Sequence, residues 1–288
     1  QVTPSVILII CTLIVYRQLH FMQERDPGFN KDQMMVIHSN GDPAKDALMQ
    51  AIKTLPNVQS VTMSSSVPGT GNPMAYSKIE NAGGEMQEAN LDLYFVDFDY
   101  LKQFGIKMVA GRGFSREFMT DTTQAMILNE SAARLFGYPS PRDAIGRNFD
   151  QWGRKGKIIG VVKDFHFMSL QNEIRPLVLR IEPDQCNLIT IQVSTSHVQQ
   201  TIASIENTWN ALLPAQPFSY FFADENFASH YADEQRFGKI FLNFGVLSII
   251  MSCLGLLGLA SYSTVQRTRE IGIRKALGAT VPAIVKLL

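Results

Sequence analysis

The sequence predicts a mixed α+β domain that is carried outside a membrane on two membrane-spanning helices. The 288-residue chain is 45% hydrophobic and only 18% charged, whereas soluble domains have about a quarter of their residues charged. The deficit lies in two stretches, because the first charged residue is Arg17 and residues 240–262 contain none. Between the two stretches the composition is that of a soluble domain, and strand patterns alternate there with helix patterns.

The two apolar stretches predict transmembrane helices at residues 1–16 and 237–262. Residues 240–262 exceed the roughly 20 residues that a spanning helix needs; the alternative is a buried helix of a large soluble core. Residues 1–16 reach only about 24 Å as a helix. They lack a basic segment and a small-residue cleavage site, which disfavours a signal peptide. We therefore expect the chain to begin part-way through a spanning helix of a longer protein.

Small residues recur at spacings of three and four in the second stretch and fall on one helical face: Gly245, Ser248, Ser252 and Gly255. In lipid, apolar contact alone gives helices no reason to associate, and small faces allow close approach. This face is a predicted helix-packing surface.

Basic residues after the second stretch set the expected orientation. Five follow Tyr262 against the single acidic residue Glu270, and such a bias keeps a short segment in the cytoplasm. Residues 17–236 are then the extracytoplasmic domain. The whole chain has 26 basic and 26 acidic residues, so no net charge favours nucleic acid as a partner. Of the three cysteines only Cys186 lies outside the apolar stretches, so no disulfide framework or thiolate metal site is expected.

The extracytoplasmic domain reads as alternating strands and helices. Strands are expected at 33–38, 58–63, 90–95, 125–128, 157–167, 188–193 and 218–222, and helices from 42 or 43 to 54, at 98–104 and at 196–212. Asn129 is the expected N-cap of a further helix that ends at Leu135 before Gly137. Residues 153–156 are expected to form a hairpin turn. Residues 17–25 and 224–241 contain no helix breaker, so both membrane helices are expected to continue outward as stalks that stand side by side.

Catalytic and metal-binding patterns are weak. The glycine turns lack the lysine and hydroxyl of a phosphate-binding loop, and the histidines show no metal-ligand spacing. Asp164 and His166 are two residues apart, which places them on one face of a strand opposite Phe165 and Phe167. We interpret that face as solvated and backed by core aromatics. Residues 64–66, three serines, read as a loop. We expect no catalytic residue, no metal site and no cofactor in this chain.

The tail carries the most specific pattern. Apolar side chains follow helical spacing in residues 265–288, and Gly278 suits a C-cap position before Thr280, which can cap a new helix. We expect a short amphipathic helix within residues 263–279 at the membrane surface, and the start of a further spanning helix at 280–288. The short helix could be a topology anchor, a binder of anionic lipid or a docking element for a cytoplasmic partner. Glu270 among the arginines, with Gly272 and Gly278, favours docking.

The run EIGIRKALGAT, residues 270–280, closely resembles the motif after the second membrane helix in ABC transporter permeases of the FtsX/MacB type. YADEQRFGKIF, SCLGLLGLASYS and QRTREIGIRKALGA resemble the same family almost without gaps. VAGRGFS (109–115), LNESAARLFG (128–137), AIGRNF (144–149) and IIGVVKDFHFMSL (158–170) are similar to its periplasmic core domain. The resemblance covers nearly the whole chain.

This resemblance implies the second half of a double-unit permease in a bacterial inner membrane, with the large domain in the periplasm. It implies a separate cytoplasmic ABC ATPase that holds ATP and magnesium and moves the outer domain, which is called mechanotransmission. The docking positions would be Arg269, Glu270, Ile271, Gly272, Ile273, Arg274, Lys275, Ala276, Leu277, Gly278 and Ala279.

The outer domain would have a porter-like lobe, from about 33 to 90 and 186 to 223, and an inserted lobe. Other implied partners are the remaining permease half or a second copy, the lipid bilayer, and a periplasmic or outer-membrane protein. The substrate is not indicated. The rival interpretation is a two-span receptor that senses an extracytoplasmic ligand; a membrane-tethered hydrolase would need a nucleophile–base pair that the sequence does not offer.

Overall fold

The computed structural model describes residues 10, 14, 17, 27–30, 32–170, 173–229 and 232–277. The chain divides into two compact units: Asp26–Tyr231, which we call the outer unit, and Gln1–Arg25 together with Ala232–Leu288. The predicted first span and the predicted segment 280–288 lie almost wholly outside the described residues.

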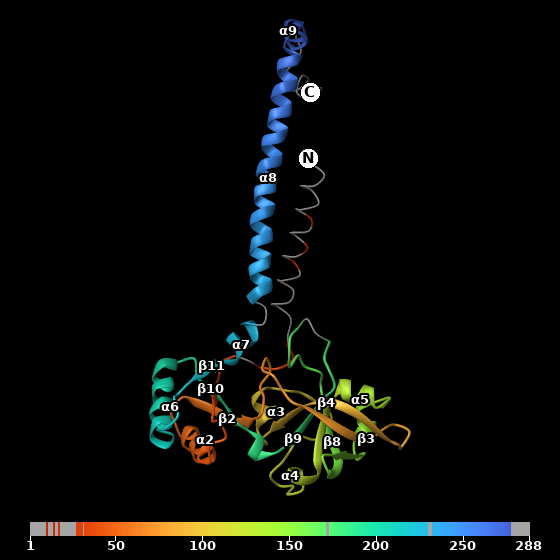
Figure 1. Ribbon diagram of the computed structural model, residues 1–288, viewed down its shortest axis with the longest axis vertical. Helices are drawn as coiled ribbons and strands as arrows, with labels where there is room; N and C mark the ends of the chain where they lie inside the picture. Colours follow the sequence, from red (N-terminus) through yellow and green to blue (C-terminus); the bar gives the residue numbers. More distant parts are fainter. Residues whose placement is uncertain are drawn as a thin grey trace. The chain divides into compact units, whose positions relative to one another are not determined.

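One half of the outer unit, the sheet lobe, is a four-stranded antiparallel sheet. Its order is β11 (Tyr220–Phe222), β1 (Met34–His38), β10 (Leu188–Val193) and β2 (Val58–Ser64). Helices α2 (Lys45–Lys53) and α6 (Val198–Leu212) lie beside this sheet (Figure 1). Alternate strand residues, such as Ile37 and Val61, join Ile52 and Trp209 of the helices in one buried cluster, because successive side chains of a strand point to opposite faces.

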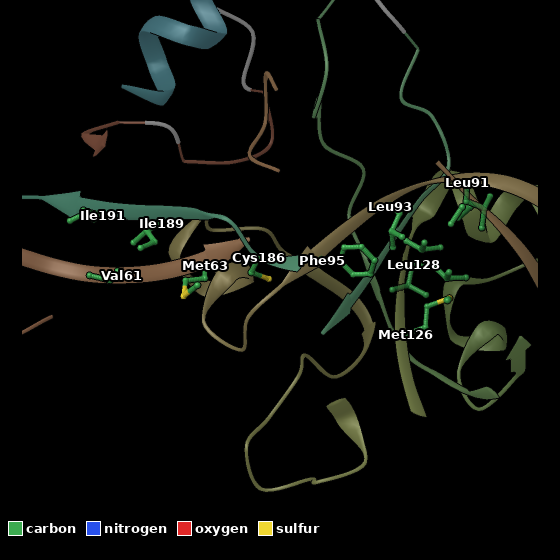
Figure 2. Packing of buried hydrophobic residues seen from close by; sticks show 14 of the residues in the cluster. Val61, Met63, Leu91, Leu93, Phe95, Met126, Leu128, Cys186, Ile189 and Ile191 are labelled. Atoms are coloured by element: carbon green, nitrogen blue, oxygen red, sulfur yellow. The ribbon is translucent and has the colours of Figure 1, made fainter. Parts of the chain in front are cut away.

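The other half, the barrel lobe, contains six strands whose pairings close into a ring. The order is β3 (Met74–Glu80), β4 (Met86–Val96), β9 (Leu177–Ile181), β6 (Ala125–Asn129), β8 (Arg154–Val162) and β7 (Asn148–Gln151), which returns to β3. A further strand, β5 (Met108–Gly111), pairs with β8. Figure 2 shows Leu91, Leu93, Met126 and Leu128 gathered in the barrel core.

Short helices connect and cover these strands. They are α3 (Tyr100–Gln103), α4 (Asp121–Gln124), α5 (Glu130–Leu135) and α7 (Ala223–Ser229), with 3₁₀ turns η1 (Pro141–Ala144) and η2 (Pro183–Gln185). The sheet lobe and the barrel lobe meet where β2 and β4 share one register pair, Ser64 with Val96. Cys186 lies at this junction between Met63 of β2 and Phe95 of β4 (Figure 2).

The predicted α+β class is confirmed, and the strands expected near 34, 58, 90, 125, 188 and 220 are present. Two expectations are wrong. The predicted end of the first porter-like segment at residue 90 is misplaced. That segment of the sheet lobe ends at Ser64, because β3 and β4 pair within the barrel. The strand expected at 157–167 ends at Val162. Strands β3, β5, β7 and β9 were not predicted; β5, β7 and β9 have only four or five residues, and each has at least one pairing with a strand that is distant in sequence.

The second unit contains α8 (Ala232–Gln266) and α9 (Thr268–Ala276). Within α8, Leu242–Gln266 is long and apolar enough to cross a membrane, and it is the one such helix among the described residues. The helix extends four residues beyond the predicted end at Tyr262, and α9 begins after a break at Arg267. The predicted stalk at 224–241 is divided between α7 and the first turns of α8, and the two residues between them lie outside the described residues.

Candidate functional site

Apolar side chains at and just after the end of α9 are exposed to solvent, whereas Ile271 within it is half-buried. Ile273 and Leu277 are one turn apart, so they share a face, and they are 62% and 82% exposed. The hydroxyl of Thr268, the first residue of α9, donates to the carbonyl groups of Thr264 and Val265. These hydrogen bonds connect α9 to the last turn of α8 across the break at Arg267. Arg269 and Gly272 are also exposed. Ile273 and Leu277 are therefore uncovered, and the exposed Arg269 lies one turn before Ile273.

Part of the predicted docking set cannot be placed on this face. The side chains of Glu270, Arg274 and Lys275 lie outside the described part of the chain, as do Gly278 and Ala279 altogether. The docking role of Arg269–Ala279 stays a prediction.

The small residues of α8 differ from the rest of the helix in exposure. Gly245 is buried and Ser248, Ser252 and Gly255 are half-buried, whereas every other described side chain from Leu242 to Gln266 except Ser263 is exposed. The four residues predicted to form a packing surface are thus on the least exposed face of α8. Their packing against another spanning helix stays a prediction.

Asp164 and His166 do not lie on a strand, and the interpretation of a solvated strand face is wrong. The Asp164 carboxylate accepts hydrogen bonds from the backbone N–H and hydroxyl of Ser131 at 2.9 and 2.8 Å, and pairs with Arg134 at 2.6 Å. It therefore satisfies one of the free N–H groups in the first turn of α5. His166 is buried, and its backbone N–H donates to the carbonyl of Pro27. Phe165, by contrast, is in the core as expected.

Two of the three serines at 64–66 have structural partners, whereas the hydroxyl of Ser64, the last residue of β2, is buried and has no hydrogen-bond partner among the described residues. Ser65 Oγ accepts from the N–H of Phe95 at 3.0 Å, and Ser66 Oγ donates to the carbonyl of Gly71 at 3.1 Å. Neither contacts a histidine or a carboxylate in these bonds. Within the described residues, no group of three or more His, Cys, Asp or Glu side chains could hold a metal ion.

A buried guanidinium at one end of the barrel was not predicted. Arg180, which is 3% exposed, donates to Gln151 Oε1 at 2.6 Å and to Glu182 at 3.1 Å, and lies over the rings of Phe95 and Trp152. Burial, and then the charge of Arg154, lowers the pKa of Arg180. The available signal was an arginine at an interior-facing position of the apolar strand LVLRI.

Clefts on the outer unit, among the described residues, include the following two. One, of about 760 Å³, lies against β7, β8 and the 112–125 segment; its lysines and arginine include Lys78, paired with Glu88 at 2.7 Å, and Arg112, paired with Asp121 at 2.6 Å. The other, of about 510 Å³, lies between β2 and α3. Both volumes are within the range of ligand sites, roughly 300–1,000 Å³, and neither cleft was predicted.

Comparison with known proteins gives one consistent result. Residues 6–208 match the family described as the MacB-like periplasmic core domain. The chain is 26% identical over 207 residues to an uncharacterized ABC transporter permease, YvrN, of Bacillus subtilis, covering 65% of this chain and 49% of YvrN. It is 24% identical over 209 residues to the macrolide export ATP-binding/permease protein MacB of Aggregatibacter actinomycetemcomitans, covering 68% of this chain and 32% of that protein.

The fold agrees with a solved structure. The crystal structure of the periplasmic region of MacB from Actinobacillus actinomycetemcomitans superposes with a TM-score of 0.51 at 16% identity, covering 71% of this chain and 94% of that one. The chain spans about half or less of the length of the curated relatives that it matches. Because the family match covers more than half of the chain, the chain belongs to the MacB-like periplasmic core domain family of ABC transporter permeases.

Proposed function

We propose that this chain is the permease part of an ABC transporter, and that a separate cytoplasmic ATPase drives movement of its outer unit. The observation that carries the proposal is α9: a short helix directly after an apolar helix of spanning length, with Ile273 and Leu277 exposed. An exposed apolar face beside basic residues is typical of a surface that a partner covers. ATP and magnesium would be bound by that partner and no cofactor by this chain.

The family supports the same assignment. The related MacB proteins are named for both ATP binding and permease activity, whereas YvrN is named as a permease. In our proposal the chain lies in a bacterial inner membrane with two spans, 1–16 and 237–262, and the outer unit faces the periplasm. The remaining permease half or a second copy would pack on Gly245, Ser248, Ser252 and Gly255. No observation favours the receptor alternative.

The outer unit supports a mechanical role over a catalytic one. Its candidate acid, Asp164, is hydrogen-bonded to the first turn of α5, and the hydroxyls of Ser65 and Ser66 are hydrogen-bonded to backbone groups. The six strands of the ring are also each paired with two ring neighbours, which holds the barrel together as one body. Such a unit transmits displacement as a body better than it reacts with a substrate.

Co-purification tests the proposal. The full-length protein is purified from native membranes as wild type and as Ile273→Glu with Leu277→Glu, and the eluate is assayed for ATP hydrolysis. Charges on the α9 face would have to be buried against the ATPase, so we expect the ATPase to be lost with the double variant. The matched control is Met119→Glu with Leu135→Glu, which changes two exposed apolar residues of the outer unit and is expected to retain the ATPase.

Wild-type protein that is folded and inserted but brings down no ATP hydrolysis would contradict the proposal. Equal hydrolysis with the α9 variant and the control would remove α9 as the docking element.

A further inference from the structure

The two ends of the outer unit meet in one buried aromatic contact. Phe29 lies near the start of the unit and Phe227 near its end, and their rings meet edge to face with 5.4 Å between the centroids. The two side chains are 7% and 2% exposed. The second unit ends at Arg25, shortly before Phe29, and resumes at Ala232, shortly after Phe227. The segments that lead from and to the second unit therefore contact each other within the outer unit.

The start of the outer unit is attached to the loop that follows β8. The carbonyl of Pro27 accepts from the backbone N–H of His166 at 2.8 Å. Gly28 has a φ of 86°, and a Cβ on it would lie only 3.0 Å from the Cβ of Phe165. Glycine adopts a positive φ without steric cost, so this close approach depends on a residue without a side chain. Phe29 also meets the ring of Phe165 edge to face, with 6.3 Å between the centroids.

The end of the outer unit is attached in a similar way to the loop that follows β2. Asn226 of α7 donates its Nδ2 to the carbonyl of Gly69 at 2.9 Å. Gly69 has a φ of 88°, and a Cβ on it would lie 3.1 Å from Cδ2 of Phe227. The two loops are in turn bonded to each other, because the N–H of Gly69 donates to the carbonyl of Phe167 at 2.9 Å.

These contacts close a ring of four segments, which we call the anchor ring. Its members are 27–29, 165–167, Gly69 and 226–227; each contacts the next, and the last contacts the first. One of the two loops follows β2 of the sheet lobe and the other follows β8 of the barrel lobe. The anchor ring therefore joins both ends of the outer unit to each other and to both lobes.

Densely packed side chains transmit strain, whereas segments with few buried contacts open locally. We propose that the anchor ring delivers a displacement of either chain end to the whole outer unit, and that the contact between Phe29 and Phe227 closes the ring. Both are positioning residues. The inference rests on the proposed function for the source of the displacement, which is ATP hydrolysis by the partner. That the ring opens and closes as one unit does not depend on the ATPase.

Hydrogen exchange of the full chain in detergent tests the ring without the ATPase. Phe29→Leu keeps an apolar side chain but removes the edge-to-face contact with Phe227. We expect exchange to become about tenfold faster or more at residues 67–71 and in α7 together. Asn226→Ala, which removes one hydrogen bond of the ring, is expected to speed exchange in the same two segments about threefold.

Phe104→Leu is the matched control. Phe104 is fully buried and its ring lies 6.4 Å from that of Phe29 between centroids, but it is outside the anchor ring. The substitution removes the same atoms from the same aromatic cluster. It is expected to leave exchange at residues 67–71 and in α7 unchanged.

Energy transfer to the membrane tests the delivery of movement. The full-length protein and its co-purified ATPase are reconstituted with acceptor-labelled lipid, and a donor is attached at Lys107→Cys in a Cys11→Ser, Cys253→Ser background. We expect ATP to change the transfer efficiency. Phe29→Leu is expected to lose at least about half of that change while it keeps ATP hydrolysis within about twofold of wild type. Phe104→Leu is expected to keep both.

Three results would overturn the proposal. They are unchanged exchange at residues 67–71 and in α7 with Phe29→Leu, equal effects of Phe29→Leu and Phe104→Leu on energy transfer, and ATP hydrolysis in wild type with no change in transfer. Protein that brings down no ATPase would contradict the proposed function instead. The exchange experiment would then still decide whether the anchor ring opens as one unit.

Discussion

Asn129 is a single residue that holds three segments together. Its Oδ1 accepts from the N–H of Ala132 at 2.8 Å, as an N-cap does, and from the N–H of Leu177 in β9 at 2.9 Å, while its Nδ2 donates to the carbonyl of Arg175. The side chain is fully buried. The sequence predicted only the first of these bonds, because the other two partners are about 46 to 48 residues away.

Asn129→Ala is expected to destabilise the outer unit by about 2–4 kcal/mol, because two buried N–H groups and one carbonyl lose their partner. Thermal unfolding of the full chain in detergent should then shift down by about 5–10 °C. Asn90→Ala, at an exposed asparagine of β4, is the control and should change stability by less than about 0.5 kcal/mol. Similar shifts in the two variants would contradict the role of Asn129.

Arg180 offers a second test at the residue scale. Arg180→Ala leaves Gln151 Oε1 without a donor and opens a void between Phe95 and Trp152, so we expect a loss of about 3–5 kcal/mol. Arg180→Met fills the volume and removes the buried charge, and it is expected to lose clearly less stability than Arg180→Ala. Arg142→Ala, at an exposed arginine, serves as the control. A methionine variant as unstable as the alanine variant would show that the charge itself is required.

At the scale of elements, Asp97 extends the short contact between β2 and β4. Its carboxylate accepts hydrogen bonds from the N–H of Met63 and from the hydroxyl of Thr62. Both residues precede Ser64, the one residue of β2 that is paired with β4. Burial raises the pKa of Asp97, although the hydrogen bonds from Thr62 and Met63 act in the opposite direction. The native state therefore keeps the proton to a higher pH than the unfolded chain, in which the carboxyl has its ordinary value of 3.8.

The sign of the pH dependence follows. The stability contribution of Asp97 is largest below its unfolded pKa and falls as the pH rises through its raised native pKa. Asp97→Asn lacks this dependence, so its unfolding temperature should improve relative to wild type between about pH 4 and 7.

Glu80→Gln is a control for which the expected pH dependence has the opposite sign. Hydrogen bonding to Arg147, and then to the Asn148 N–H, lowers the pKa of Glu80. The stability contribution of Glu80 is present above the pKa that its carboxyl has in the unfolded chain, and it is lost as the pH falls. The unfolding temperature of Glu80→Gln should therefore lie furthest below that of wild type at neutral pH. Parallel pH profiles of wild type and Asp97→Asn would contradict the assignment to Asp97.

At the scale of the whole outer unit, the sheet and barrel lobes are joined near Cys186 and the η2 turn. Lys45, the first residue of α2, donates its Nζ to the carbonyls of Pro183 and Cys186 at 2.7 and 3.1 Å. Cys186 is buried, and burial raises the pKa of its thiol to about 12. This thiol should report separation of the lobes, because a reagent needs both exposure and the thiolate.

In a Cys11→Ser, Cys253→Ser background, Cys186 should react with a thiol reagent at least about a hundredfold more slowly in the native chain than in the unfolded one. Lys45→Met removes the bonds to the η2 turn and is expected to raise the native rate. Lys107→Met, at an exposed lysine outside the junction, should leave the rate unchanged. Fast labelling of the native chain, or equal rates in both lysine variants, would contradict the role of Lys45 at the junction.

Local patterns determined much of this protein. The charge-free run 240–262 predicted α8, because a helix of spanning length needs only a run of apolar residues. Asn129 and Gly137 predicted the ends of α5, because capping depends on neighbours within one turn. The motifs at 109–115, 128–137 and 158–170 led to the family, and the family match agrees.

Only the tertiary structure decided which strands close the barrel and that β2 pairs with β4 at Ser64 alone. These outcomes depend on pairings between distant segments, such as β4 with β9, and the sequence of either strand does not specify its partner. For the same reason the sequence placed Asp164 on a solvated strand, whereas the fold brings it to Ser131 and Arg134, about 30 residues away. Residues of β2 and α3, among them Val58 and Lys102, line one cleft only because α3 folds beside β2.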